Sequence, residues 1–365
     1  MTLKVLAVVS EIYPLVKTGG LADVAGALPG ALAAEDIAVT TLIPGYPAVM
    51  AELKKPEVVH TFPGLFGHDA RLLKAHAKGL DLLVLDAPHL FNRPGNPYVD
   101  GDGRDWMDNP LRFAALSRVA AEIGQGLVPR LTPDVIHAHD WQTGLTAAYM
   151  RYDERVAIPT VMTVHNLAFQ GQYGRDLLPA LGLPARAYAV DGVEYYGTIG
   201  FLKAGLQLSD RITTVSPTYA AEIRTGEGGM GLDGLLRSRG NAVSGILNGI
   251  DTAVWNPATD TSIAAPYDLA KMAGRAVNKK ALQQRLGLDV DPNALIFGVV
   301  SRLSWQKGLD LLLDRLPVIL GSGGQLALLG SGEPWLANGF GGATTLHRGR
   351  VGMINGYDEG LAHLI

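Results

Sequence analysis

The segment KTGGLADV, residues 17–24, combines a lysine, two adjacent glycines and an aspartate shortly after the first apolar run of the chain. Lys17 supplies a positive charge, and the pair Gly19 and Gly20 lets a ligand approach the backbone closely. A helix that begins there presents unpaired N–H groups to the same place. The residues therefore favour a site for a phosphate or a sugar phosphate. The alternative is an ordinary helix start, with Asp23 as a first-turn acid and Lys17 in solvent.

Histidines follow two later apolar runs. DVIHAHDWQ places His137, His139 and Asp140 at the end of one predicted strand, and TVMTVHNLAFQG places His165 and Asn166 at the end of the next. Since consecutive strands of a parallel sheet end at one edge, we expect these side chains to face one crevice. Strand alternation puts the first two histidines on one side, but without an evident third ligand we predict no metal site. The alternative for His165 is a histidine of the core or of a helix cap.

Two cations flank a predicted loop in the second half of the chain. Arg302 and Lys307 lie in SRLSWQKGLD, between a predicted strand and a predicted helix. Cations at the carboxyl end of a strand are well placed to clamp a diphosphate. Ordinary surface cations are the alternative. The turn GSGE, which begins at Gly330, is a weak glycine signal by itself.

The elements that would hold these residues alternate between strands and helices. Continuous apolar, β-branched runs predict strands at residues 4–10, 39–44, 81–86, 134–139, 160–165, 211–216 and 242–249. Such runs are typical of strands that are buried on both faces of a parallel sheet. Residues 21–35 and 109–128 have helical periodicity. The alternation predicts a doubly wound α/β domain.

The pattern restarts after the turn-rich segment NGIDTAVWNP, residues 248–257. Strands are predicted at 294–302 and 325–333 and near 344–347, with helices at 308–320 and 360–365. We therefore expect two domains, residues 1–250 and 251–365. The second has fewer strands than a doubly wound domain usually needs, so we expect it to be incomplete.

Composition excludes several classes of protein. The chain has 31 basic and 35 acidic residues and a net charge of −4, which argues against nucleic acid as a partner. It has no cysteine, so disulfides and thiolate zinc sites are impossible. The apolar run at residues 5–9 is too short for a signal peptide or a membrane span. We expect a cytoplasmic protein that does not bind membranes.

Seven segments together resemble the bacterial glycogen synthases and plant starch synthases. They are KTGGLADV, HAHDWQ, TVHNLAFQGQ, EYYG with FLKAGL, VSPTYAAEI, GILNGID with WNP, and SRLSWQKGLD, in that family's order and spacing. The resemblance runs from about residue 4 to about residue 330 and on to GYDEGLAHLI. It implies the GT-B fold, in which two Rossmann-like domains face a cleft. Residues 1–250 would be the starch-synthase catalytic domain on the acceptor side, and 251–365 a partial glycosyltransferase domain on the nucleotide side.

The family transfers glucose from ADP-glucose to the non-reducing end of an α-1,4-glucan, with retention of configuration. The resemblance implies catalytic roles for His165, Lys17, Arg302 and Lys307. It implies that the Lys17 loop holds the donor's phosphate and sugar, that His165 and its neighbour meet the glucose, and that the second-half cations bind the diphosphate. The substrate-binding residues implied in this way are Lys17, Gly19, Gly20, Asp23, Tyr98, Asp140, Asn166, Asn248, Arg302, Lys307 and Gly330.

The physical chemistry of this transfer fits such a site. Breaking the bond between glucose and diphosphate builds negative charge on the phosphate, and fixed cations in a dry cleft stabilise it. They can replace a metal ion, so we expect no metal and no cofactor. In front-face attack the departing phosphate accepts the acceptor's proton, so no protein base is needed.

The sequence departs from the family at its end. Family members continue past the position of Ile365 with a Glu-Pro loop that contacts the donor glucose and a second Gly-Gly loop near the phosphates. We therefore expect a C-terminally truncated chain with an unpaired apolar sheet edge, for which a loss of activity is one alternative. The alternatives are a fragment that binds glucan or nucleotide, and another GT-B glucosyltransferase, which uses UDP-glucose or makes a sucrose or trehalose phosphate.

Overall fold

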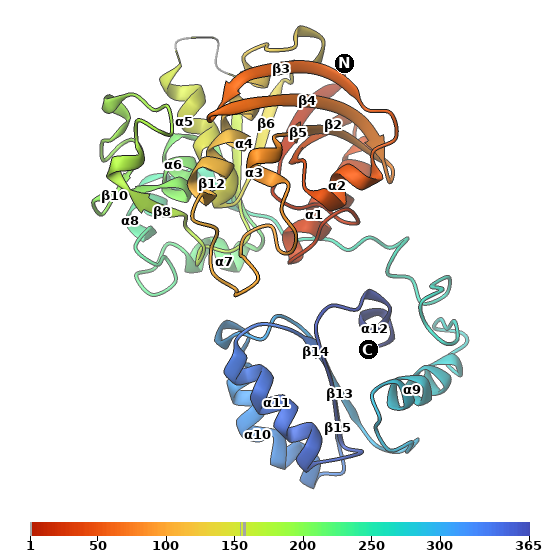
Figure 1. Cartoon of the computed structure of the whole chain (residues 1–365). Coiled ribbons are helices and arrows are strands. Elements are labelled where there is room, and N and C mark those ends of the chain that lie inside the picture. Colours follow the sequence, from red (N-terminus) through yellow and green to blue (C-terminus); the bar gives the residue numbers. More distant parts are fainter. Residues whose placement is uncertain (1, 154, 156–157) are drawn as a thin grey trace. The chain divides into compact units, whose positions relative to one another are not determined.

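The computed structural model describes residues 2–153, 155 and 158–365. The chain forms two compact units, Met1–Gly249 and Ile250–Ile365 (Figure 1). The sequence placed the border between residues 250 and 251. Each unit has its own β-structure and its own buried apolar side chains.

The first unit is built on a nine-stranded sheet of order β12-β11-β7-β6-β1-β2-β5-β4-β3. The seven strands from β12 to β5 are parallel, and all seven predicted strands are present. The strands are β1 (Leu3–Val8), β2 (Ile37–Pro44), β3 (Glu57–Leu65), β4 (His68–Ala77), β5 (Leu80–Asp86), β6 (Val135–His139), β7 (Thr160–Val164), β11 (Arg211–Thr214) and β12 (Val243–Gly245).

Helices follow most of the parallel strands, as a doubly wound fold requires. They are α1 (Gly20–Ala33), α2 (Pro47–Glu52), α3 (Pro88–Phe91), α4 (Asn109–Gly124), α5 (Leu145–Tyr152), α6 (Phe201–Leu208), α7 (Pro217–Glu222) and α8 (Asp233–Ser238). The helix α4 packs against β1, β2, β6 and α5. Its Phe113, Leu116 and Val119 are fully buried, so this helix forms the centre of the first core.

Two antiparallel parts of the first unit were not predicted. The strands β3 and β4 form a hairpin that extends the sheet beyond β5. The buried residues of β4 are interrupted by exposed ones, because one face of the hairpin meets solvent, and a search for continuous apolar runs misses such strands. A second sheet of order β8-β10-β9 consists of very short strands, β8 (Gln172–Gly174), β9 (Glu194–Tyr195) and β10 (Thr198–Gly200).

The second unit has a parallel sheet of order β13-β14-β15. Its strands are β13 (Ile296–Val300), β14 (Gln325–Gly330) and β15 (Val351–Asn355), and its helices are α9 (Gly274–Arg285), α10 (Leu309–Gly321), α11 (Pro334–Leu346) and α12 (Glu359–Leu364). Among the described residues β13 is an edge strand, and Phe297 and Val300 on it are exposed.

The strand predicted near residues 344–347 is wrong. This segment is the end of α11, and the third strand, β15, begins only at Val351. Leu336, Phe340 and Ala343 recur at helical spacing and are buried on one face. The glycines of α11 suit close packing, since a Cβ at Gly339 would lie 2.5 Å from a side-chain carbon of Leu313 in α10.

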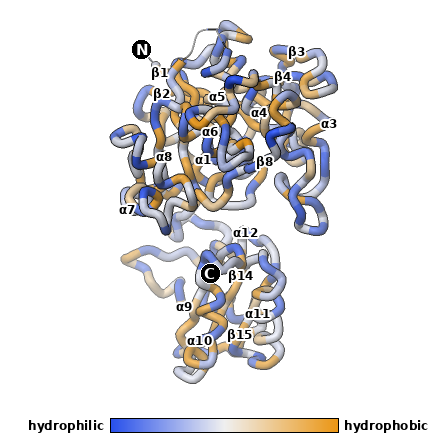
Figure 2. Tube along the Cα trace, turned by 90° about the vertical axis from the view of Figure 1, so that its left-hand side faces the viewer, coloured by the Kyte–Doolittle hydropathy of each residue, from blue (hydrophilic) through white to orange (hydrophobic). Residues whose placement is uncertain are grey.

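Apolar and polar stretches alternate along the chain in both units (Figure 2). No helix in the described part of the chain is long and apolar enough to cross a membrane.

Candidate active site

The loop between β1 and α1 is held by a buried carboxylate. Glu11, which is 4% exposed, accepts hydrogen bonds from the backbone N–H groups of Thr18 and Gly19. Burial raises the pKa of Glu11, although the bonds to Thr18 and Gly19 oppose the shift. A role for Glu11 could not be predicted from the sequence, because nothing in the motif indicates that its carboxylate folds back onto the loop.

Lys17 lies in this loop beside the start of α1. Its Nζ is 2.9 Å from Oδ1 of Asp23, and its side chain is 19% exposed. The N–H of Gly19 is directed to Glu11 at 3.3 Å, so it is already engaged by the protein. A Cβ at Gly20 would meet nothing within 4 Å, so the backbone there stands in open space. The part of the loop suited to a ligand is therefore Lys17 with Gly20.

Tyr98 is tied to the same loop. Its hydroxyl lies 2.8 Å from Oγ of Ser10, which follows β1. Burial, followed by the charge of Glu11, raises the pKa of Tyr98 well above its usual value. Arg112 of α4, 1% exposed, donates to the carbonyl of Pro97 at 2.9 Å and so fixes the chain just before Tyr98.

Asp140 joins the ends of β6 and β7. Its N–H donates to the carbonyl of Thr163 at 2.9 Å, and its Oδ1 accepts from the N–H of His165 at 2.7 Å. Asp140 has a φ of 56°, a left-handed conformation that is uncommon for residues other than glycine. Such strain clusters at functional sites, where the surrounding contacts enforce it. The N–H of Asn166 also approaches Oδ1 of Asp140, at 3.5 Å.

The three histidines at these strand ends lie together, as the strand order predicted. Nδ1 of His139 is 3.0 Å from Nε2 of His165, and the ring centroids of His137 and His139 are 4.1 Å apart. Burial lowers the pKa of His137 and that of His165 to about 4, and it lowers the pKa of His139 as well. The three rings are therefore neutral at pH 7. Within the described residues, no group of three histidine, aspartate or glutamate side chains is arranged to hold a metal ion.

These lowered pKa values predict a loss of stability in acid. An unfolded histidine takes up a proton near pH 6.5, whereas folded His137 does so only near pH 4. Between these values the unfolded state binds more protons, so the free energy of unfolding falls as the pH decreases. Each such histidine contributes up to about 1.4 kcal/mol per pH unit in that window.

The prediction is checked by urea unfolding at several pH values between 7 and 4 in the wild type and in His137→Gln. The amide of Gln can still donate to Oγ1 of Thr163, which lies 2.6 Å from Nε2 of His137. The variant should show the smaller pH dependence. An equal change of the free energy of unfolding with pH in both proteins would contradict the lowered pKa of His137.

In the second unit, Arg302 and Lys307 lie on the loop between β13 and α10, at the carboxyl end of β13. Both side chains are exposed. Glu333 fixes the loop, because its N–H donates to the carbonyl of Leu303 at 2.7 Å and its Oε1 accepts from the N–H of Trp305 at 3.1 Å. The loop is thus held in one shape with both cations on it.

Gly330 ends β14 directly beside this loop. A Cβ there would lie 1.9 Å from the carbonyl oxygen of Ser301, so no other residue could take this place without a backbone shift. The glycine signal therefore has a structural cause, the close approach of two strand ends.

Most, but not all, of the predicted site residues in the first unit lie on segments that contact one another. Contacts around Glu11 and Asp140 link the segments that carry Lys17, Tyr98 and His165. Asn248 is exposed, three residues beyond β12, and β12 lies two strands from β7.

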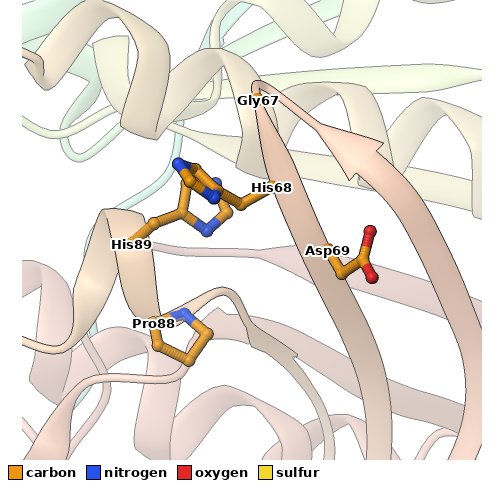
Figure 3. Close-up of a pocket in the computed structure, with 5 residues that line it drawn as sticks. All are labelled: Gly67, His68, Asp69, Pro88 and His89. Carbon is orange, nitrogen blue, oxygen red and sulfur yellow. The ribbon is translucent and has the colours of Figure 1, made fainter.

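Two surface hollows of about 570 and 330 Å³ lie elsewhere. The larger is lined by Gly67, His68, Asp69, Pro88 and His89 (Figure 3). Both adjoin the hairpin of β3 and β4, and no predicted site residue lines either of them. The candidate site is therefore identified not by a hollow but by the polar contacts among residues at the strand ends.

Comparisons with known proteins agree with the family resemblance that the sequence motifs indicate. The family model described as the starch synthase catalytic domain matches residues 4–238. A glycogen synthase of Rhodopseudomonas palustris is 64% identical over 364 residues, which are 100% of this chain and 75% of the relative. A glycogen synthase of Methylocella silvestris is 62% identical over 363 residues, with the same coverage of 100% and 75%.

Solved structures also resemble the chain. The catalytic domain of starch synthase IV from Arabidopsis thaliana, bound to ADP and acarbose, has a TM-score of 0.89 and 30% identity. The match covers 100% of this chain and 76% of that one. Sucrose-phosphate synthase from Thermosynechococcus elongatus has a TM-score of 0.53 and 17% identity over 99% of this chain and 72% of its own, a likeness in fold alone.

Proposed function

The chain belongs to the family of starch and glycogen synthases, and we propose that it is a glycogen synthase. In this proposal it transfers glucose from ADP-glucose to the non-reducing end of an α-1,4-glucan, with retention of configuration. The main support is the 64% identity to a glycogen synthase over the full chain. The similar starch synthase IV, bound to ADP and acarbose, supports a nucleotide and a glucan-like sugar as ligands. The family resemblance and the GT-B fold class predicted from the sequence are confirmed.

The proposed chemistry assigns the cations to the leaving diphosphate. In this proposal Lys17, Arg302 and Lys307 neutralise the negative charge that develops as the bond to the anomeric carbon breaks. Arg302 can donate two parallel hydrogen bonds to phosphate oxygens, whereas the lysines act as point charges. The departing phosphate accepts the proton of the attacking glucan hydroxyl, so no protein base takes part.

Other polar residues position the substrates. Asp23, whose Oδ1 is 2.9 Å from Nζ of Lys17, holds the ammonium group beside the first turn of α1. His165 and Asn166, held by Asp140, contact the glucose in this proposal. Tyr98 and Asp140 line the sugar and acceptor side in this proposal, and the substrate-binding roles of Asn248 and Gly330 stay predictions. The absence of a metal or cofactor and a cytoplasmic location stay predictions.

A donor assay tests the proposed reaction. The chain is incubated with a maltooligosaccharide and radiolabelled ADP-glucose or UDP-glucose, and the label in lengthened glucan is counted. We expect incorporation from ADP-glucose at the higher rate. Preference for UDP-glucose would favour the alternative glucosyltransferase.

Calorimetry with ADP and with maltooligosaccharide distinguishes the remaining alternative. We expect both to bind. Binding of the sugar without ADP, combined with no turnover of either donor, would favour a glucan-binding fragment over an enzyme.

A further inference from the structure

A hydrogen bond between two imidazole rings connects the strand ends. Nδ1 of His139, the last residue of β6, lies 3.0 Å from Nε2 of His165, which follows β7. His139 is 1% exposed, and its other ring nitrogen, Nε2, is buried and meets no hydrogen-bond partner among the described residues. A bond between two ring nitrogens needs a proton on one and a lone pair on the other. Its direction therefore fixes which nitrogen of His165 carries a proton.

Both rings are neutral at pH 7. Burial lowers the pKa of His165 to about 4. The pKa of His139 is well below its usual value, first because of burial and then because of the neighbouring rings of His137 and His165. A neutral imidazole carries a single N–H. Two arrangements are thus available: His139 donates from Nδ1, or His165 donates from Nε2.

The unpartnered nitrogen of His139 distinguishes these arrangements. If His165 donated, the one proton of His139 would lie on Nε2, as a buried N–H without an acceptor. Buried N–H groups without an acceptor are rare in protein backbones, and under-satisfied acceptors are somewhat less rare, which favours the arrangement without an orphaned N–H. If His139 donates, its proton is used in the bond and only a lone pair is left without a partner.

We propose that His139 is a positioning residue that donates its Nδ1–H to Nε2 of His165, so that His165 offers an Nδ1–H donor to the substrate. The identity of that substrate, a sugar nucleotide, rests on the proposed function, whereas the proton position does not. A neutral N–H donor suits an oxygen acceptor such as a glucose hydroxyl. Because the bond to His139 fixes the proton beforehand, the donor is already in place when the ligand binds.

Nitrogen-15 NMR of the full chain, with labelled histidine, tests the proton position directly. In the wild type, Nδ1 of His165 should show the chemical shift of a protonated ring nitrogen and Nε2 that of an unprotonated one. The opposite pattern in His165 would overturn the proposal. This result depends on no ligand and no turnover.

Two substitutions test the role of His139. The amide of His139→Asn keeps an N–H near the position of Nδ1, whereas His139→Leu removes it. The leucine variant should shift the proton of His165 toward Nε2 and weaken ADP-glucose binding about two- to tenfold, the loss of one hydrogen bond, while ADP binding stays unchanged. The asparagine variant should restore both the wild-type shifts and the affinity.

His137→Gln is the matched control, since the ring of His137 is bonded to Thr163 and not to His165. It should leave the nitrogen shifts of His165 as in the wild type. A leucine variant with unchanged His165 shifts would overturn the proposal. If the wild type bound no ADP-glucose, the proposed function would fail, and the NMR shifts would still decide the tautomer.

Discussion

Arg302→Ala is expected to lower kcat/KM for ADP-glucose by about 10²–10³-fold, the usual effect of removing one donor that stabilises developing negative charge. Arg302 lies at the carboxyl end of β13 on a loop that Glu333 holds in place. A planar guanidinium can bind two phosphate oxygens at once, and alanine leaves none of these bonds. Calorimetry should also show ADP binding about 10- to 100-fold weaker, as for a lost hydrogen bond to a charged group.

Arg348→Ala is the matched control for this substitution. Arg348 is an exposed arginine of the same unit, but it precedes β15 and therefore lies at the amino end of the parallel sheet. Its removal should change neither ADP affinity nor turnover. Equal effects of the two substitutions would mean that general charge, and not the position of Arg302, governs nucleotide binding.

Lys17→Ala is expected to weaken ADP binding about 10-fold or more and to slow turnover about 10²-fold, with little loss of stability. The ion pair of Lys17 with Asp23 is partly exposed, with side chains 19% and 46% accessible, and such a pair contributes about 0–1 kcal/mol to folding. The unfolding midpoint in urea should therefore barely move while nucleotide affinity falls. This separation of binding from stability distinguishes a ligand contact from a structural ion pair.

Lys74→Ala is the control in the first unit. Lys74 is exposed on β4, in the hairpin beyond β5, and it lies outside the candidate site. It should bind ADP like the wild type. A Lys17→Ala protein that loses stability but keeps its ADP affinity would assign Lys17 to the fold alone.

The parallel sheet could be predicted from the sequence because its strands are buried on both faces. Runs such as those of β1 and β7 are mostly apolar or β-branched, and few elements besides buried strands produce so short and continuous a run. The hairpin of β3 and β4 was not predicted, because exposed residues such as Arg71 and Lys74 interrupt the buried apolar side chains of β4. Near residue 345 a helix was mistaken for a strand, because short apolar segments next to glycines fit both patterns.

The candidate site was predictable where residue type and strand end coincide. The facing of His139 and His165 followed from the order of β6 and β7, and the structure confirms it. The hydrogen bonds that the protein's own side chains make to the backbone of the site could not be predicted. Glu11 engages the N–H of Gly19, and Arg112 holds the chain before Tyr98, because both side chains fold back into the interior. Such contacts depend on packing between segments far apart in sequence.

We propose that Lys17 and Arg302 bind the diphosphate of the donor, and a crystal structure of the chain with ADP tests this proposal most directly. We predict that Nζ of Lys17 and the guanidinium of Arg302 each lie about 2.7–3.2 Å from phosphate oxygens of the same nucleotide. A structure in which ADP contacts one of these cations and the other faces away from the phosphates would contradict the account.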